Sequence, residues 1–218
     1  MDRLRNLIDG ALDATVAPGY SRVGYEIRSR SHDWESLSPT ALEGRVVVVT
    51  GATSGLGLAT ARRVRALGAT LVLVGRDRER TEKVRAELVD EIRSAGTVHV
   101  VVADMAEPGQ VRAASGEIAR MTRVDALIHN AGTLSPQRIV NAGGLESTLA
   151  AQVVGPFVMT TALLDVLERD QGRVITVSSG GMYTAGLPDM SDESPTPLRA
   201  SSYDGTKQYA TAKRMQVT

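Results

Sequence analysis

The stretch that decides the fold of this chain reads Val46-Val47-Val48-Val49-Thr50-Gly51-Ala52-Thr53-Ser54-Gly55-Leu56-Gly57. Four consecutive β-branched residues are typical of a strand that is covered on both faces, as in a parallel sheet. The strand leads directly into a glycine-rich turn, and a helix is predicted over about 56–67. This stretch therefore predicts the opening strand, turn and helix of a βαβ series.

The same alternation continues along the chain. Further strands are predicted at 71–74, at 98–103, within 125–129 and at 173–177. Strands that alternate with helices imply parallel pairing and right-handed crossovers. The predicted fold class is therefore α/β, with a doubly wound, mostly parallel sheet of the Rossmann type in one domain over 45–218.

Helical patterns fill the intervals between the strands. Asp77 can cap the helix that follows the second strand. A longer pattern over about 145–167 should be kinked by Gly155-Pro156. A last helix is predicted from near residue 202 or 206 to the terminus.

Residues 1–44 differ from this regular part and are predicted to form a helical N-terminal arm. Apolar residues at helical spacing from Leu4 to Leu12 predict a short amphipathic helix. Residues 20–39 are polar and are predicted to be irregular. A surface arm is favoured over a membrane-surface or dimer contact, because the helix is short and has no excess of lysine and arginine.

Composition narrows the function classes. The 218 residues include 25 Lys+Arg and 25 Asp+Glu, so nothing calls for a nucleic-acid partner. There is no cysteine, which excludes disulfides, thiolate catalysis and Cys-ligated zinc, and no metal site is expected. No apolar run approaches the ~18 residues of a transmembrane segment. A cytoplasmic location is expected, since a chain without cysteine suits a reducing compartment.

The glycine-rich turn has the features that a dinucleotide phosphate requires. One glycine permits a tight turn, a second lets the backbone approach a pyrophosphate, and a third lets the helix pack against the strand. The helix N-terminus adds free N–H groups and a positive dipole. The spacing is GxxxGxG, and the alternative is a glycine-rich turn without a ligand. The predicted cofactor residues of this turn are Gly51, Thr53, Ser54, Gly55, Leu56 and Gly57.

Arg76 follows the second predicted strand, where the adenosine ribose of such a cofactor would lie. A guanidinium there can bind a 2′-phosphate with two hydrogen bonds, whereas an acidic residue would bind a 2′-hydroxyl. The nearest acid, Asp77, is better used as a helix cap. We therefore expect NADP(H) to be preferred over NAD(H), and the alternative is a solvated surface arginine.

Two further strand ends complete the predicted cofactor site. Asp104 and Met105 follow the third strand, where they could meet the adenine, although Asp104 could equally cap the next helix. Asn130, Ala131 and Gly132 end the fourth strand. Small residues there would let the backbone approach the cofactor, and the asparagine amide could hold neighbouring strands together.

Tyr209 and Lys213 are four residues apart on a predicted helix, so their side chains share a face. A free phenol has a pKa near ~10, and a neighbouring ammonium favours the phenolate. Such a phenol could give a proton to a carbonyl oxygen while a nicotinamide supplies hydride to the carbon. Ser179, at the end of the fifth strand, could bind the same oxygen. These three residues are predicted to be catalytic, and Tyr209 and Lys213 also to contact the cofactor.

Tyr203 and Lys207 show the same spacing six residues earlier. The two pairs would lie about 240° apart around one helix, so both cannot face one nicotinamide. Asp204-Gly205 is a poor helix interior, whereas the residues after Tyr209 are good helix formers. Tyr209 and Lys213 are therefore preferred.

Taken in order, the glycine-rich turn, Asn130-Ala131-Gly132, Ser178-Ser179 and the Tyr-x-x-x-Lys pattern resemble the short-chain dehydrogenase/reductase family over about 45–218. In that family the serine, tyrosine and lysine have the roles argued above, and the lysine also binds the nicotinamide ribose. Residues 174–183 and 209–217 resemble one branch of the family, which also has an N-terminal arm.

Two departures from the family pattern are expected to matter. The family usually has an asparagine in the kinked helix that completes a proton relay through water, and the matching position here is Gln152, which we add to the catalytic set. The chain also ends inside the predicted tyrosine helix, whereas family members continue with two strands and a substrate lid. A truncated or degenerate product with an open sheet edge is expected.

The resemblance implies an NAD(P)-dependent oxidoreductase that acts on a small-molecule carbonyl or alcohol. One alternative is a catalytically impaired dinucleotide-binding or scaffold protein, which Gln152 and the early end favour. Another is a sugar-nucleotide epimerase or dehydratase, although such enzymes usually need a C-terminal substrate domain. Helices 145–167 and 203–218 could pair across a homodimer, as in many relatives. The loop 180–202 hints at an apolar substrate.

Overall fold

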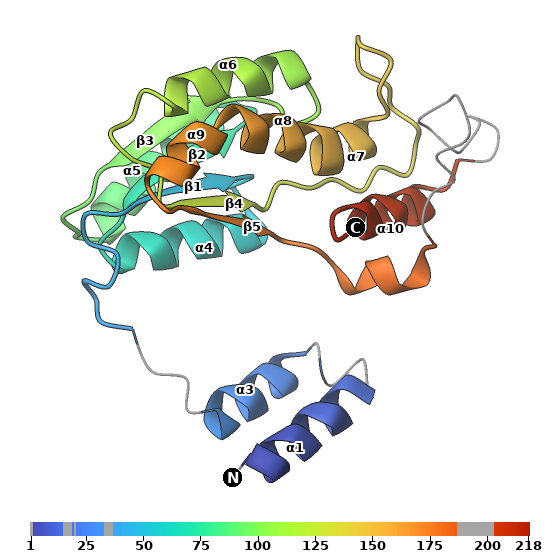
Figure 1. The fold of residues 1–218 in the computed structure, drawn as a ribbon. Helices are drawn as coiled ribbons and strands as arrows, with labels where there is room; N and C mark the ends of the chain where they lie inside the picture. Colours follow the sequence, from blue (N-terminus) through green and yellow to red (C-terminus); the bar gives the residue numbers. More distant parts are fainter. Residues whose placement is uncertain (1, 15–18, 20, 33–36, 187–202) are drawn as a thin grey trace. The chain divides into compact units, whose positions relative to one another are not determined.

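The structure is a computed structural model that describes residues 2–14, 19, 21–32, 37–186 and 203–218. The chain divides into two compact units, Met1–Ser38 and Pro39–Thr218 (Figure 1). The predicted loop at 180–202 therefore lies mostly outside the described residues. Within the described ranges, no helix is long and apolar enough to cross a membrane.

A five-stranded sheet with the order β3-β2-β1-β4-β5 forms the centre of the larger unit (Figure 1). Every neighbouring pair is parallel. Along the chain, β2 and β3 are added on one side of β1, and β4 and β5 are then added on the other side. The topological switch point therefore lies between β1 and β4. The predicted doubly wound Rossmann fold is confirmed. The strands are β1 (Val46–Thr50), β2 (Thr70–Gly75), β3 (Val98–Val102), β4 (Ala126–His129) and β5 (Arg173–Thr176).

Alternate residues of β1 are buried against opposite helix layers. Val47 and Val49 belong to the apolar core under α4 and α5, whereas Val46 and Val48 belong to the core under α6, α8 and α9. All five residues of β1 are buried, as the four-valine run predicts. By contrast, all four residues of β5, at the edge of the sheet, are exposed. The helices of the two layers are α4 (Gly55–Ala66), α5 (Arg78–Glu91), α6 (Pro108–Ile118), α8 (Gly155–Ala162) and α9 (Leu164–Arg169).

The prediction of one kinked helix over 145–167 is wrong, because this segment does not form a single continuous helix. Four consecutive pieces stand in its place: α7 (Ser147–Leu149), the π-helical turn η1 (Ala150–Val154), α8 and α9. Pro156 has no N–H for the carbonyl of Gln152, and the π-helical turn accommodates this loss just before the proline. The sequence predicts the irregularity at Gly155-Pro156 but not its form.

Two helices that follow β5 complete the larger unit. The 3₁₀ helix η2 (Gly180–Thr184) begins directly after Ser179, whose Oγ accepts the N–H of Gly181 at 3.2 Å. The helix α10 (Gly205–Met215) begins after Asp204, whose carboxylate accepts the N–H groups of Thr206 and Lys207. The predicted last helix is thus confirmed with a start near 206.

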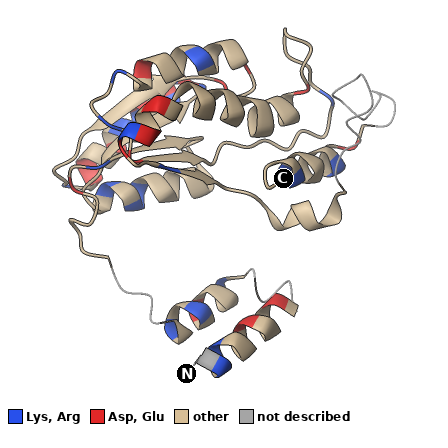
Figure 2. Cartoon of the chain, viewed as in Figure 1, with Lys and Arg blue, Asp and Glu red and all other residues tan. Residues whose placement is uncertain are grey.

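The described residues of the smaller unit include the helices α1 (Asp2–Ala14) and α3 (Arg22–Ser31), with charges of both signs (Figure 2). The irregular conformation predicted for 20–39 is therefore wrong for α3. Ser21 caps this helix by accepting the N–H of Val23 at 3.2 Å. The sequence gives little warning of α3, because only Val23 and Ile27 mark an apolar face at helical spacing.

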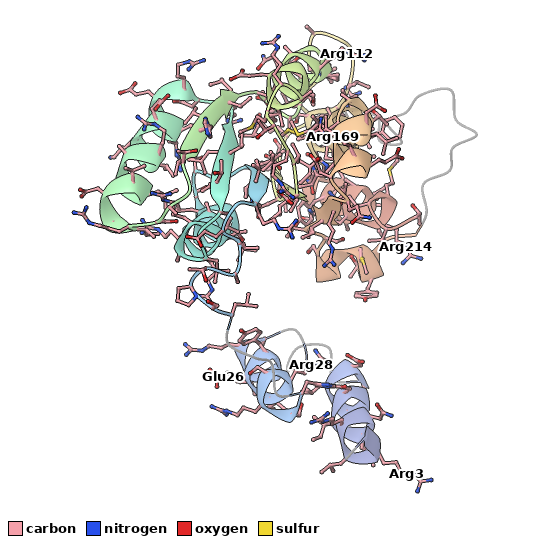
Figure 3. The ribbon with its side chains drawn as sticks, turned by 60° about the vertical axis from the view of Figure 1, so that its left-hand side comes forward. Arg3, Glu26, Arg28, Arg112, Arg169 and Arg214 are labelled. Carbon is pink, nitrogen blue, oxygen red and sulfur yellow. The ribbon has the colours of Figure 1, made fainter. Side chains whose placement is uncertain are left out.

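Arg28 of α3 joins the two helices of this unit (Figure 3). Its guanidinium donates to Asp13 at 2.6 Å and to the carbonyl oxygen of Gly19 at 3.1 Å. His32 adds a 2.8 Å contact from Nε2 to Asp9. These contacts hold α1 and α3 together within the smaller unit.

Candidate active site

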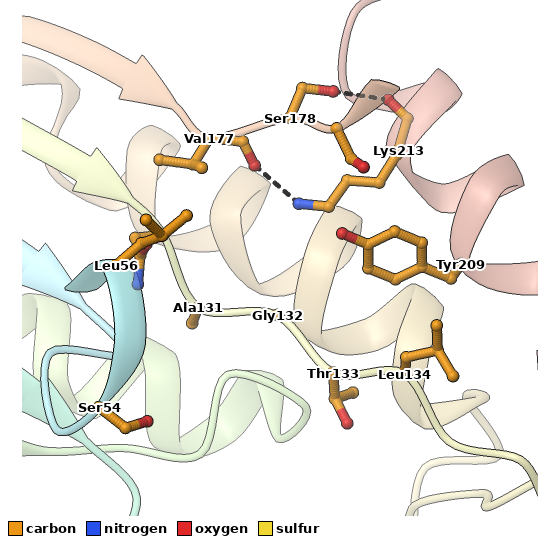
Figure 4. A pocket seen from close by; sticks show the side chains of 12 residues that line it. Ser54, Leu56, Ala131, Gly132, Thr133, Leu134, Val177, Ser178, Tyr209 and Lys213 are labelled. Atoms are coloured by element: carbon orange, nitrogen blue, oxygen red, sulfur yellow. Dashed lines mark hydrogen bonds between the residues drawn. The ribbon is translucent and has the colours of Figure 1, made fainter. Parts of the chain in front are cut away.

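A pocket of about 390 Å³ opens at the carboxyl ends of β1, β4 and β5. Its walls come from the turn after β1, the segment after β4, the end of β5 and the helix α10 (Figure 4). Parallel sheets bind ligands at this edge, beside the switch point. The lining residues are Ser54, Leu56, Asn130, Ala131, Gly132, Thr133, Leu134, Val177, Ser178, Ser179, Tyr209 and Lys213.

The glycine-rich turn is shaped by contacts that a side chain would obstruct. Gly51 has a φ of +65°, and a Cβ there would lie 2.8 Å from the Cα of Ala131. A Cβ on Gly57 would collide with the carbonyl oxygen of Gly51 and the amide of Asn130. Ser54 precedes α4 without a side-chain cap bond, and the first turn of α4 has no acidic residue. These features fit a dinucleotide phosphate at the positive end of α4.

Asn130 fastens the end of β4 to the turn after β1. Its side-chain Nδ2 donates to the carbonyl oxygens of Thr50 at 3.1 Å and Gly51 at 3.3 Å. The Thr50 hydroxyl oxygen in turn accepts the backbone N–H groups of Asn130 and Ala131, both at 3.1 Å. The asparagine amide thus holds the two strand ends together and leaves Ala131 and Gly132 in the pocket wall.

Lys213 is the single charged residue among the described residues that line the pocket, and it is 3% exposed. Its Nζ donates to the carbonyl oxygen of Val177 at 2.7 Å and lies 5.7 Å from the ring centroid of Tyr209. Figure 4 shows the Lys213 ammonium and the Tyr209 hydroxyl on the same side of the pocket. Burial lowers the pKa of Lys213 to about 8.

The end of β5 supplies two serines with different partners. Ser178 Oγ donates to the backbone oxygen of Lys213 at 3.2 Å and so ties α10 to the sheet (Figure 4). Ser179 Oγ accepts the N–H of Gly181, and among the residues that the structure describes its own proton has no acceptor, so it can be donated to a ligand. A Cβ on Gly181 would lie 3.5 Å from Ser179 Oγ and 3.7 Å from the Tyr209 ring, so the two side chains flank this glycine.

Gln152 lies beside the pocket in η1, fully buried. Its Nε2 donates to the carbonyl oxygen of Thr133 at 2.8 Å, and its backbone oxygen accepts Nε2 of Gln216 at 2.7 Å. That backbone oxygen is free for Gln216 because Pro156 has no N–H to offer it. Gln152 therefore joins the pocket wall and α10 to the π-helical turn, but it does not line the pocket.

The residues predicted to bind the adenosine half lie outside the pocket lining. Arg76 is exposed after β2, and Arg80 of α5 reaches the carbonyl oxygen of Thr53 with Nη2 at 3.5 Å. Asp77 caps α5 by accepting the N–H of Arg80 at 2.8 Å, as predicted. Arg80 was not among the predicted site residues, because its spacing from Arg76 indicates only a helix surface.

Asp104 does not cap the helix that follows it. Glu107 is at the N-cap position of α6, and the Asp104 carboxylate accepts the N–H of Ala106 at 2.9 Å in a turn before the helix. The capping alternative for Asp104 is therefore wrong, because Pro108 sets the helix start further along the chain. Met105 is buried against the α6 and α8 layer.

The competing pair, Tyr203 and Lys207, is split by the start of α10. Tyr203 precedes the helix, and its hydroxyl donates to Glu146 Oε1 at 3.2 Å. Lys207 is exposed, whereas Tyr209 and Lys213 face the pocket. Asp204 marks this boundary in the sequence, because an aspartate is a good N-cap and a poor interior residue.

Four lining residues were not among the predicted site residues: Thr133, Leu134, Val177 and Ser178. Each lies within two residues of a predicted site residue, so extending the predicted set by two residues at each strand end would have found them. Leu56 and Leu134, which are exposed in the described part of the chain, give the pocket mouth an apolar character.

The buried ammonium of Lys213 predicts a pH dependence of stability. Its folded pKa of about 8 lies below the ordinary 10.5, so the unfolded chain binds more protons between these values. The free energy of unfolding should therefore rise as pH increases through this interval, and the cost of the buried charge is fully present below it. We expect Lys213→Met to remove this rise in urea unfolding measured across the interval. Lys207→Met, an exposed change on the same helix, should retain it, and equal curves for both variants would contradict the assignment.

Comparisons with known sequences agree with this geometry. The sequence profile of the short chain dehydrogenase family matches residues 45–188. Human Dehydrogenase/reductase SDR family member 12 is 37% identical over 203 residues, which cover 91% of this chain and 61% of that protein. It represents the branch that 174–183 and 209–217 resemble, so that prediction is confirmed. Mouse polyprenol dehydrogenase is 34% identical and covers 68% of this chain and 46% of that protein.

Solved structures share the fold. A candidate NAD(P)-dependent gluconate 5-dehydrogenase from Beutenbergia cavernae, with bound NADP, superposes with a TM-score of 0.63 at 26% identity and covers 83% of this chain and 65% of that one. A 3-oxoacyl (acyl-carrier-protein) reductase from Agrobacterium tumefaciens C58, with NADP bound, has a TM-score of 0.63 at 23% identity and covers 84% and 65%. The chain spans about three fifths of the length of the first curated relatives that it matches.

Proposed function

This chain belongs to the short-chain dehydrogenase family of oxidoreductases, and we propose that it interconverts a carbonyl and an alcohol with Tyr209 as the proton donor or acceptor. The observation that carries the proposal is one pocket lined by the glycine-rich turn, Ser179, Tyr209 and Lys213. Residues from three strand ends and one helix meet there, although they are far apart in the sequence.

The chemistry divides between cofactor and protein. A bound nicotinamide supplies or accepts the hydride at the carbon. The phenol of Tyr209 gives its proton to the carbonyl oxygen, and Ser179, whose hydroxyl proton remains available, donates a hydrogen bond to the same oxygen. The Lys213 ammonium, 5.7 Å from the ring centroid of Tyr209, stabilises negative charge on that phenol. The turn after β1 and the start of α4 would hold the pyrophosphate.

Turnover tests the proposal most directly. We expect the chain to consume NADPH in the presence of at least one member of a panel of small apolar ketones and aldehydes. Cofactor binding without consumption, in this chain and in a version extended at its C-terminus, would favour a dinucleotide-binding or scaffold protein instead. Gln152, which stands where the family usually has asparagine, is the observation that favours that second function.

We propose NADPH as the preferred cofactor, with Arg76 as the residue that binds the 2′-phosphate. Arg76 is exposed at the end of β2, and Arg80 adds a second guanidinium near Thr53. We expect Arg76→Ala to lower the ratio of NADPH to NADH affinity by about 10- to 100-fold, because hydrogen bonds between charged groups are lost.

Isothermal titration with each cofactor measures this ratio. Arg112→Ala, which removes an exposed arginine from α6, is the matched control and should leave the ratio unchanged. An unchanged ratio in Arg76→Ala would assign the 2′-phosphate to another residue or remove the preference for NADPH.

A further inference from the structure

Glu146 is a buried carboxylate that the proposed reaction does not use. It is 1% exposed and stands at the N-cap position of α7. Its oxygens accept the N–H groups of Thr148 at 2.8 Å and Leu149 at 2.9 Å. Acidic residues are almost never fully buried unless they are paired with other groups. The burial of Glu146 therefore points to a second task.

That second task involves the segment that contains Tyr209. Gln208, itself 2% exposed, donates from Nε2 to Glu146 Oε2 at 2.9 Å, and the Tyr203 hydroxyl donates to Oε1 at 3.2 Å. Burial raises the pKa of Glu146, but the hydrogen bonds from Thr148, Leu149 and Gln208 outweigh it, so the pKa lies below its usual value. The carboxylate stays charged at neutral pH and joins α7 to the start of α10.

A second contact that holds α10 in place, the second joint, lies at Gln216, directly after the last residue of the helix and eight residues beyond Gln208. Gln216 donates to the backbone oxygen of Gln152 in η1, about 12 Å from Gln208 along the helix axis. Tyr209 and Lys213 lie between these two joints in sequence. Rotation or sliding of α10 would break both joints, because each uses a buried group in a fixed position.

We propose that Glu146 is a positioning residue. Through Gln208 and Tyr203 it fixes the rotation of α10 about its axis and its position along that axis, so that the Tyr209 hydroxyl meets the substrate oxygen beside Ser179. This inference rests on the proposed function and assigns no chemistry to Glu146 itself. A displacement of about 1 Å at a reacting group can cost about 100-fold in rate, so a joint of this kind acts on kcat.

Glu146→Gln tests the proposal by kinetics. An amide in place of the carboxylate sets an NH₂ group against one of the N–H donors and removes the charge. We expect kcat for NADPH-dependent carbonyl reduction to fall by about 10- to 100-fold, with the KM for the carbonyl and the Kd for NADPH changed by less than about threefold.

The matched control is Asp170→Asn. Asp170 accepts the N–H of Val124 at 2.8 Å and pairs with Arg169, so this change also removes a structural carboxylate, but one whose described partners lie outside α10. It should lower Tm but leave kcat within about twofold, because distant sites act independently. If the two variants lose equal kcat at equal loss of Tm, Glu146 is a stabilising residue only.

Two further variants separate the joint from the cap. Gln208→Met leaves the cap of α7 intact and removes one donor, so it should lower kcat in the same direction as Glu146→Gln. The exchange Glu146→Gln with Gln208→Glu restores an amide opposite a carboxylate but leaves the cap of α7 with one N–H facing an NH₂ group, so we expect a kcat between those of Glu146→Gln and the parent chain. A normal kcat in Gln208→Met would overturn the proposal.

Amide hydrogen exchange provides a readout that does not need turnover. We expect Glu146→Gln to speed exchange in α10 and to leave α5 unchanged. If the parent chain consumes no NADPH but this change in α10 is seen, the proposed function fails and the joint stands. Unchanged protection of α10 in Glu146→Gln would overturn the joint, whatever the activity.

Discussion

Tyr209→Phe is expected to lower kcat for carbonyl reduction by about 10²- to 10⁴-fold, which is the usual contribution of a general acid. Phenylalanine keeps the ring beside Lys213 and removes only the hydroxyl, so the Kd for NADPH should change little. Tyr209 is the single tyrosine among the pocket residues that the structure describes, and no neighbouring phenol there can replace it. Steady-state kinetics with saturating NADPH measure the loss.

Tyr203→Phe is the decisive comparison. Its hydroxyl donates to Glu146, so we expect a loss of less than about tenfold, through the position of α10 rather than through proton transfer. Tyr25→Phe, in the smaller unit, controls for the loss of any phenol. A larger loss in Tyr203→Phe than in Tyr209→Phe would reverse the assignment of the two Tyr-x-x-x-Lys pairs.

Gly57→Ala is expected to damage both stability and cofactor binding. The new methyl group would collide with the Gly51 carbonyl and with the Asn130 amide, both of which are held in place by the turn. Relief requires α4 to move away from β1 or Asn130 to release the strand ends. We expect the free energy of unfolding to fall by about 1–3 kcal/mol, as for other overpacked sites, and the Kd for NADPH to rise by more than about tenfold.

Gly109→Ala is the matched control for this variant. Gly109 is also in the first turn of a helix, α6, but a Cβ added there would meet nothing within 4 Å, and its φ is not positive. This change should stabilise the protein slightly, by about 0.4–1 kcal/mol. If Gly57→Ala behaves like Gly109→Ala in urea unfolding and NADPH titration, close packing at the turn does not require a glycine at position 57.

Local patterns were enough to predict the fold. The four valines of β1 and the glycines after it identify a buried parallel strand and a tight turn, and both features are found in the structure. The Tyr209 and Lys213 pair was also readable, because residues four apart on a helix share a face. Such signals succeed because the residues that create them are neighbours in the sequence.

The parts that could not be predicted depend on partners distant in the sequence. Glu146 reads as an ordinary helix cap, and only the folded chain brings Gln208 and Tyr203 to it across about sixty residues. The hydrogen bond from Gln216 to the carbonyl of Gln152 in the π-helical turn likewise joins residues more than sixty positions apart. No periodicity in a single sequence marks a bond of this kind.

Pro156, which has no N–H for the Gln152 carbonyl, also affects what a shared Tyr-x-x-x-Lys pattern says about the position of the phenol in related proteins. In a chain with an ordinary residue at position 156, that carbonyl could also accept an N–H of its own helix, and a glutamine at 216 would then share the oxygen with a second donor. Two proteins can thus share the pattern and still present the phenol at different angles. Comparing positions 146, 152, 156, 208 and 216 alongside the pattern would separate such cases before any assay.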